Sequence, residues 1–253
     1  MDIFFSDLDN TLIYSHNRKI DGEKVAAEYL NGREQSYMTR KTYDFLTQAY
    51  WLNVVPVTTR TEAQYRRINC IDAFNIRYAV ICNGGKLLID GTEDKNWTEE
   101  TLRLTEGQID ELEEATRLLE KLCGKSEIHR PEAYMSYVGA EEPQRLCDEL
   151  RKMIKGENVR AEYDRRKVYL FASTVNKGSA VRRFRRIMNV GKTVAAGDDI
   201  MDIPMLNEVD YALAADKIFD SIKVSEKQRL CGEVISDKIC MNLEIIHRLG
   251  VLK

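Results

Sequence analysis

Short apolar runs alternate with helical patterns along the first third of the chain. Ile3–Phe5, Val54–Val57 and Tyr78–Cys82 have the length and the polar flanking residues of buried strands. A helix that Thr39 would cap precedes the second run, and a helical pattern around residues 62–71 precedes the third. Strands and helices that alternate in this way predict a parallel, doubly wound sheet.

A β-hairpin is predicted between the first apolar run and the helix that Thr39 would cap. Segments 25–30 and 33–37 flank Asn31-Gly32, the dipeptide that best fits a two-residue turn between antiparallel strands. The first helix of the core is therefore expected only after this hairpin.

The alternation of strands and helices stops at residue 85. The elements expected next are a strand at Leu87–Ile89, a long helix bearing Ile109 to Leu122, an extended segment at 134–138, a helix opened by Pro143, and strands at 159–163 and 168–172. This order predicts an antiparallel sheet with two covering helices. We therefore expect an α/β chain in which residues 1–84 and 174–253 form the core, and residues 85–173 form an inserted α+β domain.

The predicted core resumes with a helix from Lys177 to Met188, strands at 193–196 and 211–214, and a closing helix from Ser236 to Gly250. The first of these helices has a polar face rich in arginine. On an amphipathic helix of an acidic protein, such a face is more often solvated than bound to nucleic acid.

Composition narrows the range of partners. The chain has 253 residues, of which 43% are hydrophobic, and its 38 basic and 41 acidic residues give a formal charge of -3. This share of hydrophobic residues can fill a core. The small net charge creates no overall electrostatic field that would favour binding to nucleic acid or to an anionic membrane. No apolar stretch approaches the roughly 20 residues of a membrane span, and we expect no targeting segment before the first strand, because no basic region precedes it. The six scattered cysteines lack metal-site or disulfide spacing. We expect a cytoplasmic protein with reduced thiols, a monomer or weak homodimer, that binds a small molecule.

Candidate chemistry lies where the predicted parallel strands end. Asp7 and Asp9 follow the first strand, Thr58 follows the second, and Gly197–Asp202 follows the first strand after the insertion. Lys177 opens the helix before that strand. Because open parallel sheets bind ligands outside the carboxyl ends of their strands, these residues are candidates for one site.

These four groups, in this order, resemble the motifs of the haloacid dehalogenase (HAD) phosphatase superfamily. Those motifs are an Asp-x-Asp after strand one, a Thr or Ser after strand two, a distant Lys, and a Gly-Asp followed by a further acid. The insertion resembles the C2-type cap of the subgroup that includes Cof-like and sucrose-phosphate phosphatases. The hairpin resembles the flap of these enzymes, with an ordinary surface hairpin as the alternative. The resemblance implies a Rossmann-like core and a cap that sets substrate specificity.

The resemblance also implies a role for each motif residue. Asp7 attacks phosphorus and forms an aspartyl-phosphate, while Asp9 acts first as general acid and then as general base. Thr58 and Lys177 complete the catalytic set because they bind the phosphoryl group and its charge. The residues expected to bind substrate are Thr59, Arg60, Asn83 and Gly84 in the core, and Arg130, Tyr134 and Arg165 in the cap.

Crowding of carboxylates at these strand ends indicates a metal ion. Asp7, Asp198 and Asp202 are expected in one pocket, where like charges require a counter-cation. Ligands that are all oxygen favour Mg²⁺. The resemblance assigns Asp7, Asp198 and the backbone carbonyl of Asp9 as ligands, with Asp202 bound to the ion or next to it. Asp199 is equally well explained as a helix N-cap.

Two positions depart from the common subgroup pattern. Thr59 stands where glycine is usual, and Met201 stands where asparagine is usual. Neither change removes a catalytic carboxylate, so the reaction class is better indicated than the substrate.

The leading hypothesis is a Mg²⁺-dependent phosphatase that acts on a small phosphorylated metabolite, with sugar phosphates as the expected substrate class. One alternative is a phosphomutase or phosphotransferase on the same fold. The other is a non-catalytic phospho-signalling or binding domain.

Overall fold

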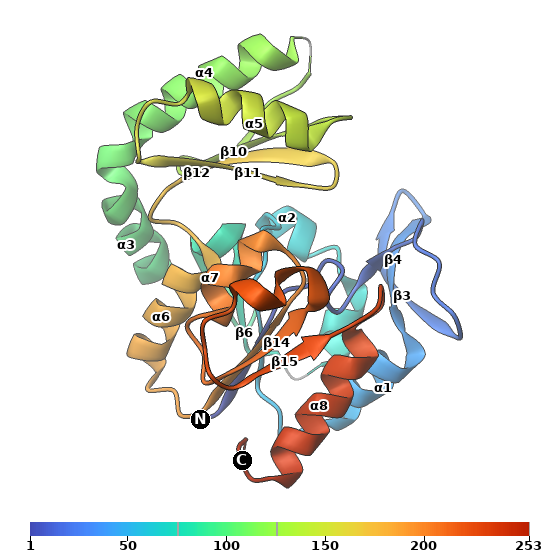
Figure 1. The fold of residues 1–253 in the computed structure, drawn as a ribbon. Helices are drawn as coiled ribbons and strands as arrows, with labels where there is room; N and C mark the ends of the chain where they lie inside the picture. Colours follow the sequence, from blue (N-terminus) through green and yellow to red (C-terminus); the bar gives the residue numbers. More distant parts are fainter. Residues whose placement is uncertain (75, 125, 253) are drawn as a thin grey trace. The chain divides into compact units, whose positions relative to one another are not determined.

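The computed structural model describes residues 1–74, 76–124 and 126–252. The chain divides into two compact units (Figure 1). Unit 1 comprises Met1–Glu93 and the chain from Lys177 onward, and unit 2 comprises Asp94–Asn176. Among the residues in these described ranges, no helix combines the length and apolar character needed to cross a membrane.

A five-stranded parallel sheet forms the centre of unit 1. Its strands, in spatial order, are β15 (Lys227–Leu230), β14 (Tyr211–Ala215), β13 (Thr193–Gly197), β1 (Ile3–Ser6) and β5 (Val54–Pro56). Every residue of β1 is buried, as expected for a strand covered on both faces. The predicted parallel sheet is confirmed, but the apolar run at 78–82 is not one of its five strands: this run belongs to a separate three-stranded sheet and meets the strand at 54–57 through a parallel bridge between Val57 and Val80. The edge strand β15 was not predicted, because its sequence KQRL is mostly polar.

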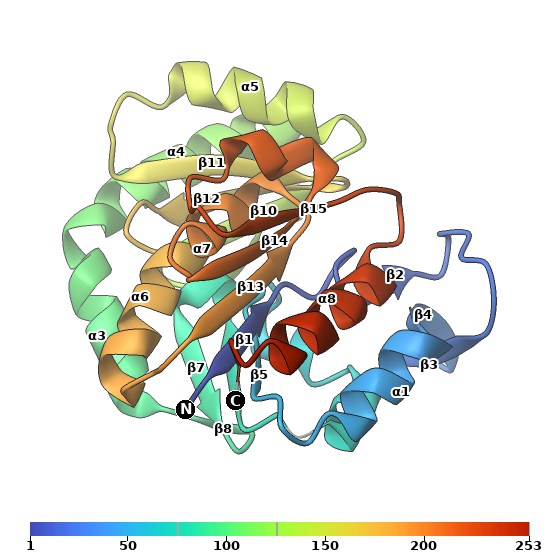
Figure 2. The ribbon, with the colours of Figure 1, turned by 60° about the horizontal axis from the view of Figure 1, so that its bottom comes forward.

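Helices cover both faces of this sheet (Figure 2). α1 (Arg40–Gln48) and α8 (Ser236–Arg248) pack together on one face. α6 (Lys177–Met188) lies on the other face, where Phe184 packs edge-on against Phe5 of β1 with ring centroids 5.5 Å apart. This arrangement is the doubly wound α/β architecture that the sequence predicts.

The predicted hairpin is also confirmed. β3 (Lys24–Leu30) pairs antiparallel with β4 (Arg33–Thr39), which also pairs with the short β2 (Tyr14–Ser15). Asn31 and Gly32 both have positive φ, 53° and 75°, as a tight two-residue turn requires. The register between β3 and β4 shifts on either side of Glu28.

Residues 62–93 differ from prediction in two ways. The helix expected at 62–71 is α2 (Glu62–Tyr65) followed by the 3₁₀ turn η1 (Asn69–Ala73), because Ile68 is extended and forms a bridge with Glu28 of β3. The strands of this region are β6 (Tyr78–Ile81), β7 (Lys86–Ile89) and β8 (Thr92–Glu93), with the 3₁₀ turn η2 (Cys82–Gly84) after β6. β7 pairs antiparallel with β6, so residues 85–93 pack with unit 1 and not with the insertion.

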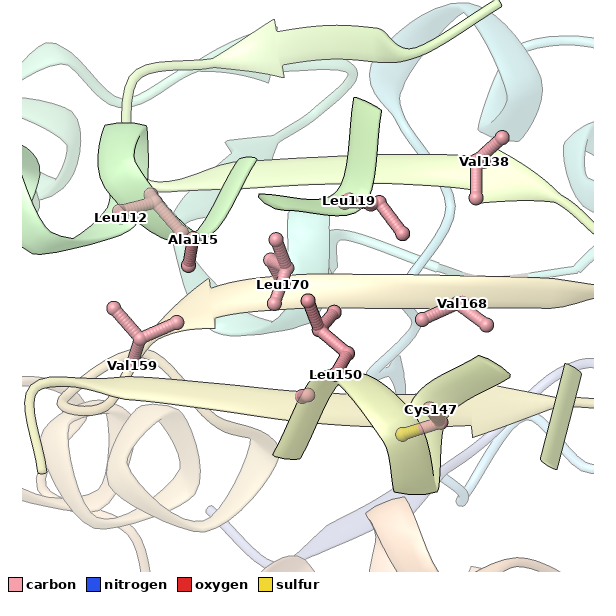
Figure 3. Packing of buried hydrophobic residues seen from close by; sticks show 10 residues of the cluster. Leu112, Ala115, Leu119, Val138, Cys147, Leu150, Val159, Val168 and Leu170 are labelled. Carbon is pink, nitrogen blue, oxygen red and sulfur yellow. The ribbon is translucent and has the colours of Figure 1, made fainter. Parts of the chain in front are cut away.

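Unit 2 is an antiparallel sheet with helices packed on one face. Its strands, in spatial order, are β11 (Val159–Asp164), β12 (Lys167–Ala172), β10 (Met135–Gly139) and β9 (His129–Glu132). Its helices are α3 (Lys95–Thr105), the 3₁₀ turn η3 (Glu106–Gln108), α4 (Ile109–Cys123) and α5 (Pro143–Met153). Figure 3 shows Leu119 of α4 and Leu150 of α5 in one buried cluster with Leu170 of β12. The expected antiparallel sheet with covering helices is therefore present.

Close packing of α6 on α7 (Ile203–Leu206) generates a stability prediction. A Cβ at Gly178 would lie 2.5 Å from the carbonyl oxygen of Pro204, a backbone atom that cannot easily move. We expect Gly178→Ala to lower the free energy of unfolding by about 1–3 kcal/mol. The measurement is the midpoint of urea unfolding.

Gly107→Ala is the matched control for this change. A Cβ at Gly107 meets nothing within 4 Å, so its unfolding midpoint should stay close to that of the parent. Equal midpoints for the two variants would contradict the packing argument.

Candidate active site

The predicted motif residues converge at the carboxyl ends of the strands of unit 1. Asp7 follows β1 and Asp198 follows the neighbouring β13, while Thr58 comes after β5 on the other side of β1. The backbone N–H of Asp7 still donates to the carbonyl of Ala196, at 3.0 Å, so the two strands end side by side. Parallel pairing thus brings together acids that are 191 residues apart in the sequence.

Lys177, the first residue of α6, connects Asp7 to Asp202. Its Nζ donates to Oδ1 of Asp7 at 2.5 Å and to Oδ1 of Asp202 at 2.6 Å, and its side chain is only 3% exposed. Burial acts to lower the pKa of Lys177, but the charges of Asp202 and Asp7 outweigh burial and raise the pKa above its ordinary value. The site therefore contains a permanent buried ammonium.

Asp202 organises the loop after β13. This residue ends the 3₁₀ turn η4 (Ile200–Asp202), and its Oδ2 accepts the backbone N–H groups of Asp198 at 2.9 Å and Asp199 at 3.0 Å. A Cβ at Gly197 would lie 2.4 Å from the Cβ of Asp202, so only glycine leaves room for this loop. Both carboxylate oxygens of Asp202 thus have protein donors.

Asp7, Asp198 and Asp202 form a buried acidic triad. Each offers one oxygen, and these oxygens lie within 4.8 Å of one another. Oγ1 of Thr11 lies 3.4 Å from Oδ2 of Asp7 and 3.3 Å from Oδ1 of Asp198. Thr11 was not predicted as a site residue, although it lies two residues after Asp9.

Burial and mutual repulsion raise the pKa values of two acids of the triad, Asp7 and Asp198. Burial raises the pKa of Asp7 well above its ordinary value, although Lys177 opposes this effect. Burial, and then repulsion by Asp202, raise the pKa of Asp198 from 3.8 to about 7, although Lys217 opposes them. A divalent cation at these oxygens would relieve the excess negative charge.

Asp9 is held by Arg60, which lies two residues after Thr58 of the second motif. Arg60 donates to both oxygens of Asp9, from Nε at 2.8 Å and from Nη2 at 2.9 Å. Its Nη1 and Nη2 also donate to Oε2 of Glu28, each at 3.1 Å, and Arg67 donates to Oε1 at 2.9 Å. Glu28 lies on β3 of the hairpin, and its side chain is 5% exposed, so a buried carboxylate of the hairpin holds the arginine that clamps Asp9. Glu28 was missed from the sequence because a lone glutamate in a strand carries no motif.

The loops that hold the other expected substrate-binding residues lie against each other. The N–H of Asn83 donates to the carbonyl of Thr58, and the N–H of Cys82 donates to the carbonyl of Arg60, both at 2.9 Å. Oγ1 of the buried Thr58 accepts the N–H of Arg60 at 3.2 Å. Thr59 is half-buried, and Gly84 is buried, within these paired loops.

Asp199 has the N-cap geometry that its alternative interpretation predicts. Its Oδ1 accepts the N–H of Ile200 at 2.7 Å, at the start of η4. Its Oδ2 accepts from Nζ of Lys217 at 2.8 Å, and the same ammonium lies 3.3 Å from Oδ2 of Asp198. Lys217 belongs to the 3₁₀ turn η5 (Asp216–Ser221) and was missed because no motif includes it.

The three candidate residues of unit 2 have different environments. Nη2 of Arg130 pairs with Glu120 at 2.6 Å, and both side chains are about half exposed. Arg165 is exposed in the turn between β11 and β12. Tyr134 is fully buried, which does not suit the expected contact with a substrate. A substrate role for Arg130 and Arg165 stays a prediction.

The buried position of Glu28 leads to a prediction for the hairpin. Glu28→Gln keeps an acceptor but removes the charge that faces Arg60 and Arg67, so two guanidinium groups lose a buried counter-ion. We expect the free energy of unfolding to fall by about 1–3 kcal/mol in urea titrations. Glu34→Gln, at an exposed position of β4, is the control and should leave the free energy of unfolding nearly unchanged. A loss as large in the control would refute the special role of Glu28.

A second prediction concerns the pH dependence of stability without metal. The folded state holds the Asp198 proton more tightly than the unfolded state, so stability is lost as pH rises from about 4 through about 7. Asp198→Asn cannot ionise, and we expect it to be more stable than the parent at pH 8 in EDTA by on the order of 2 kcal/mol. At pH 4 the difference should vanish. Urea unfolding at both pH values measures this, and a variant that is less stable at pH 8 than the parent would contradict it.

Comparison with known proteins assigns the chain to a family. Residues 69–225, more than half of the chain, match the haloacid dehalogenase-like hydrolases. No protein of curated function matches the chain.

Solved structures share the fold at low sequence identity. A sucrose-phosphatase from Synechocystis sp. PCC6803, in complex with sucrose and phosphate, is 15% identical, with a TM-score of 0.62 over 98% of this chain and 97% of that one. The HAD subclass IIB sugar phosphatase BT4131 is 12% identical, with a TM-score of 0.63 over 99% and 100%. Trehalose-6-phosphate phosphatase from Aspergillus fumigatus is 12% identical, with a TM-score of 0.54 over 98% and 92%. At these identities the likeness concerns the fold. The match to the family, joined to the α/β fold and the four motifs, shows that this chain belongs to the haloacid dehalogenase-like hydrolases.

Proposed function

We propose that the protein is a Mg²⁺-dependent phosphatase that hydrolyses a small phosphorylated metabolite, a sugar phosphate, through an aspartyl-phosphate on Asp7. The observation that carries the proposal is the buried contact of Lys177 with Asp7, next to Asp198. A buried carboxylate with a permanent ammonium on one oxygen and a second acid nearby fits a nucleophile that must attack the negatively charged phosphoryl group of a phosphate ester.

The charges of the site fit one divalent cation. The site has five acids and three basic groups that pair with them: Asp7, Asp9, Asp198, Asp199 and Asp202 against Arg60, Lys177 and Lys217. With all acids ionised, the excess of two negative charges equals the charge of one Mg²⁺.

The hydrogen bonds suggest which oxygens would hold the ion. Oδ2 of Asp7 and Oδ1 of Asp198 both lie near Thr11, and Lys177 and Lys217 contact the other oxygen of each carboxylate. Both oxygens of Asp202, in contrast, already accept from protein donors. We therefore assign Asp7 and Asp198 as ligands, together with the backbone carbonyl of Asp9, and Asp202 as the residue that positions Asp198. When bound, Mg²⁺ would neutralise charge on the phosphoryl oxygens.

The residues of the chain account for each bond that changes. A carboxylate oxygen of Asp7 attacks phosphorus as the bond to the leaving oxygen breaks, and Asp9 donates a proton to that oxygen. Asp9 then removes a proton from water, which attacks phosphorus and breaks the bond to Asp7, so that phosphate is released. Lys177 holds Asp7 in place, and Thr58 with the N–H of Thr59 binds a phosphoryl oxygen. Arg60 must release one oxygen of Asp9 for proton transfer, and Glu28 is the adjacent acceptor that keeps the guanidinium in place.

The substrate class is inferred from the structural relatives. The sucrose-phosphatase and the sugar phosphatase named above cover nearly all of this chain, including its inserted unit 2. We propose that unit 2 is a cap that selects the leaving group, and that Arg130 and Arg165 are its basic contacts.

The test is a panel of phosphorylated metabolites assayed for phosphate release with Mg²⁺ and with EDTA. We expect release from one or more sugar phosphates only with Mg²⁺. Asp7→Asn should reduce turnover of the best substrate to background, because an amide oxygen is a poor nucleophile, while Asp9→Asn should reduce it about 10²–10⁴-fold.

Asp44→Asn is the control for these variants, because Asp44 is a partly exposed residue of α1 and lies outside the site; its turnover should match that of the parent. Unchanged turnover in Asp7→Asn would refute the nucleophile. Isomerised sugar in place of free phosphate would identify a phosphomutase.

A further inference from the structure

Lys217 is a third cation of the site, and no motif assigns it. It lies in η5, directly after β14, the strand that pairs with β13 on the side away from β1. Its Nζ is 2.8 Å from Oδ2 of Asp199 and 3.3 Å from Oδ2 of Asp198, and its side chain is 53% exposed. The side chain of Lys217 is thus partly open to solvent, whereas that of Lys177 is buried.

The two oxygens of Asp198 have different partners. Oδ1 lies near Thr11, whose hydroxyl is also near Asp7, whereas Oδ2 faces Lys217. Lys217 thus does not occupy the space between Asp7 and Asp198. It pairs instead with the far oxygen of the same carboxylate, and so reduces the negative charge that Asp198 can offer to a cation on its near oxygen.

Asp199 gives Lys217 an anchor that does not depend on the triad. Its Oδ1 caps η4, and its Oδ2 makes the shorter contact with the ammonium. Because of this anchor, Lys217 stays beside Asp198 when the charge of Asp198 is taken up by another cation. Two positive charges would then share one carboxylate, which is unfavourable in a buried setting.

We propose that Lys217 is a positioning residue that weakens the binding of the divalent cation at Asp7 and Asp198; this rests on the proposed Mg²⁺ site. Lys217 stabilises the metal-free site by pairing with Asp198, and it opposes the incoming ion. The alternative is that Lys217 only orients Asp198 for the metal. The two roles predict opposite signs, because removing an orienting group would weaken metal binding, whereas removing a competing charge tightens it.

The experiment measures metal binding directly on the full chain, with no substrate. Mn²⁺ is titrated into metal-free protein, and free Mn²⁺ is followed by electron paramagnetic resonance; Mg²⁺ competition then gives the Kd for Mg²⁺. Lys217→Met removes the charge and keeps the length of the side chain. We expect its Kd for Mn²⁺ to be at least about 10-fold lower than that of the parent.

Two further variants separate charge from shape. Lys217→Arg keeps the charge and should bind Mn²⁺ within about 3-fold of the parent. Lys223→Met removes an exposed lysine six residues further on and should leave the Kd unchanged. Circular dichroism confirms that each variant is folded, which a half-exposed position permits.

The outcomes distinguish this inference from the proposed function. If the parent binds Mn²⁺ and Lys217→Met has an equal or higher Kd, the role of Lys217 is overturned and the Mg²⁺ site is left intact. Binding of Mn²⁺ by Lys217→Met but not by the parent supports the role in its strongest form. If neither binds Mn²⁺, both the metal site and this inference are refuted.

Discussion

The repulsion among carboxylates at the ends of β1 and β13 is the constraint on which the site depends. Parallel pairing places Asp7 and Asp198 side by side, and the turn after β13 adds Asp202. Burial strengthens the repulsion, because little water remains to screen it. The ammonium of Lys177 offsets part of this charge from inside the protein, and its position requires α6 to begin at the edge of the site. The close approach of α6 to α7 at Gly178 follows from the same requirement.

The remaining basic groups act at the edges of the acidic cluster, and each depends on an acid outside the triad. Arg60 reaches Asp9 while its other side is held by Glu28, so the geometry of Asp9 depends on the hairpin. Lys217 reaches Asp198 while Asp199 anchors it. In both cases the outer acid keeps the cation near the site when the inner acid changes its partner. The proposed function would require Asp9 and Asp198 to change partners, and the outer acids would then leave neither cation unpaired.

Much of the fold and of the inner site could be predicted from the sequence, because both depend on local patterns. The apolar runs, the Asn31-Gly32 turn and the strand-end acids each lie within short segments, and their order along the chain gives the family resemblance. The residues that sequence analysis missed depend on long-range contacts. Glu28 meets Arg60 only because β3 folds against the loop after β5, and the same contact at Ile68 interrupts the helix expected at 62–71. The polar strand β15 was missed because an edge strand needs few buried residues.

For Asp202, the motif predicted the position of the residue but only part of its role. Its spacing after Asp198 indicates an acid in or near a metal site, and the structure does place it in the triad. Its oxygens, however, accept two backbone N–H groups and the Lys177 ammonium, so its negative charge already has partners within the protein. These bonds fix the backbone of Asp198 and Asp199 at the same time. The third acid of the triad therefore shapes the loop that presents the second, and the sequence cannot distinguish this task from metal binding because both require an acid at the same position.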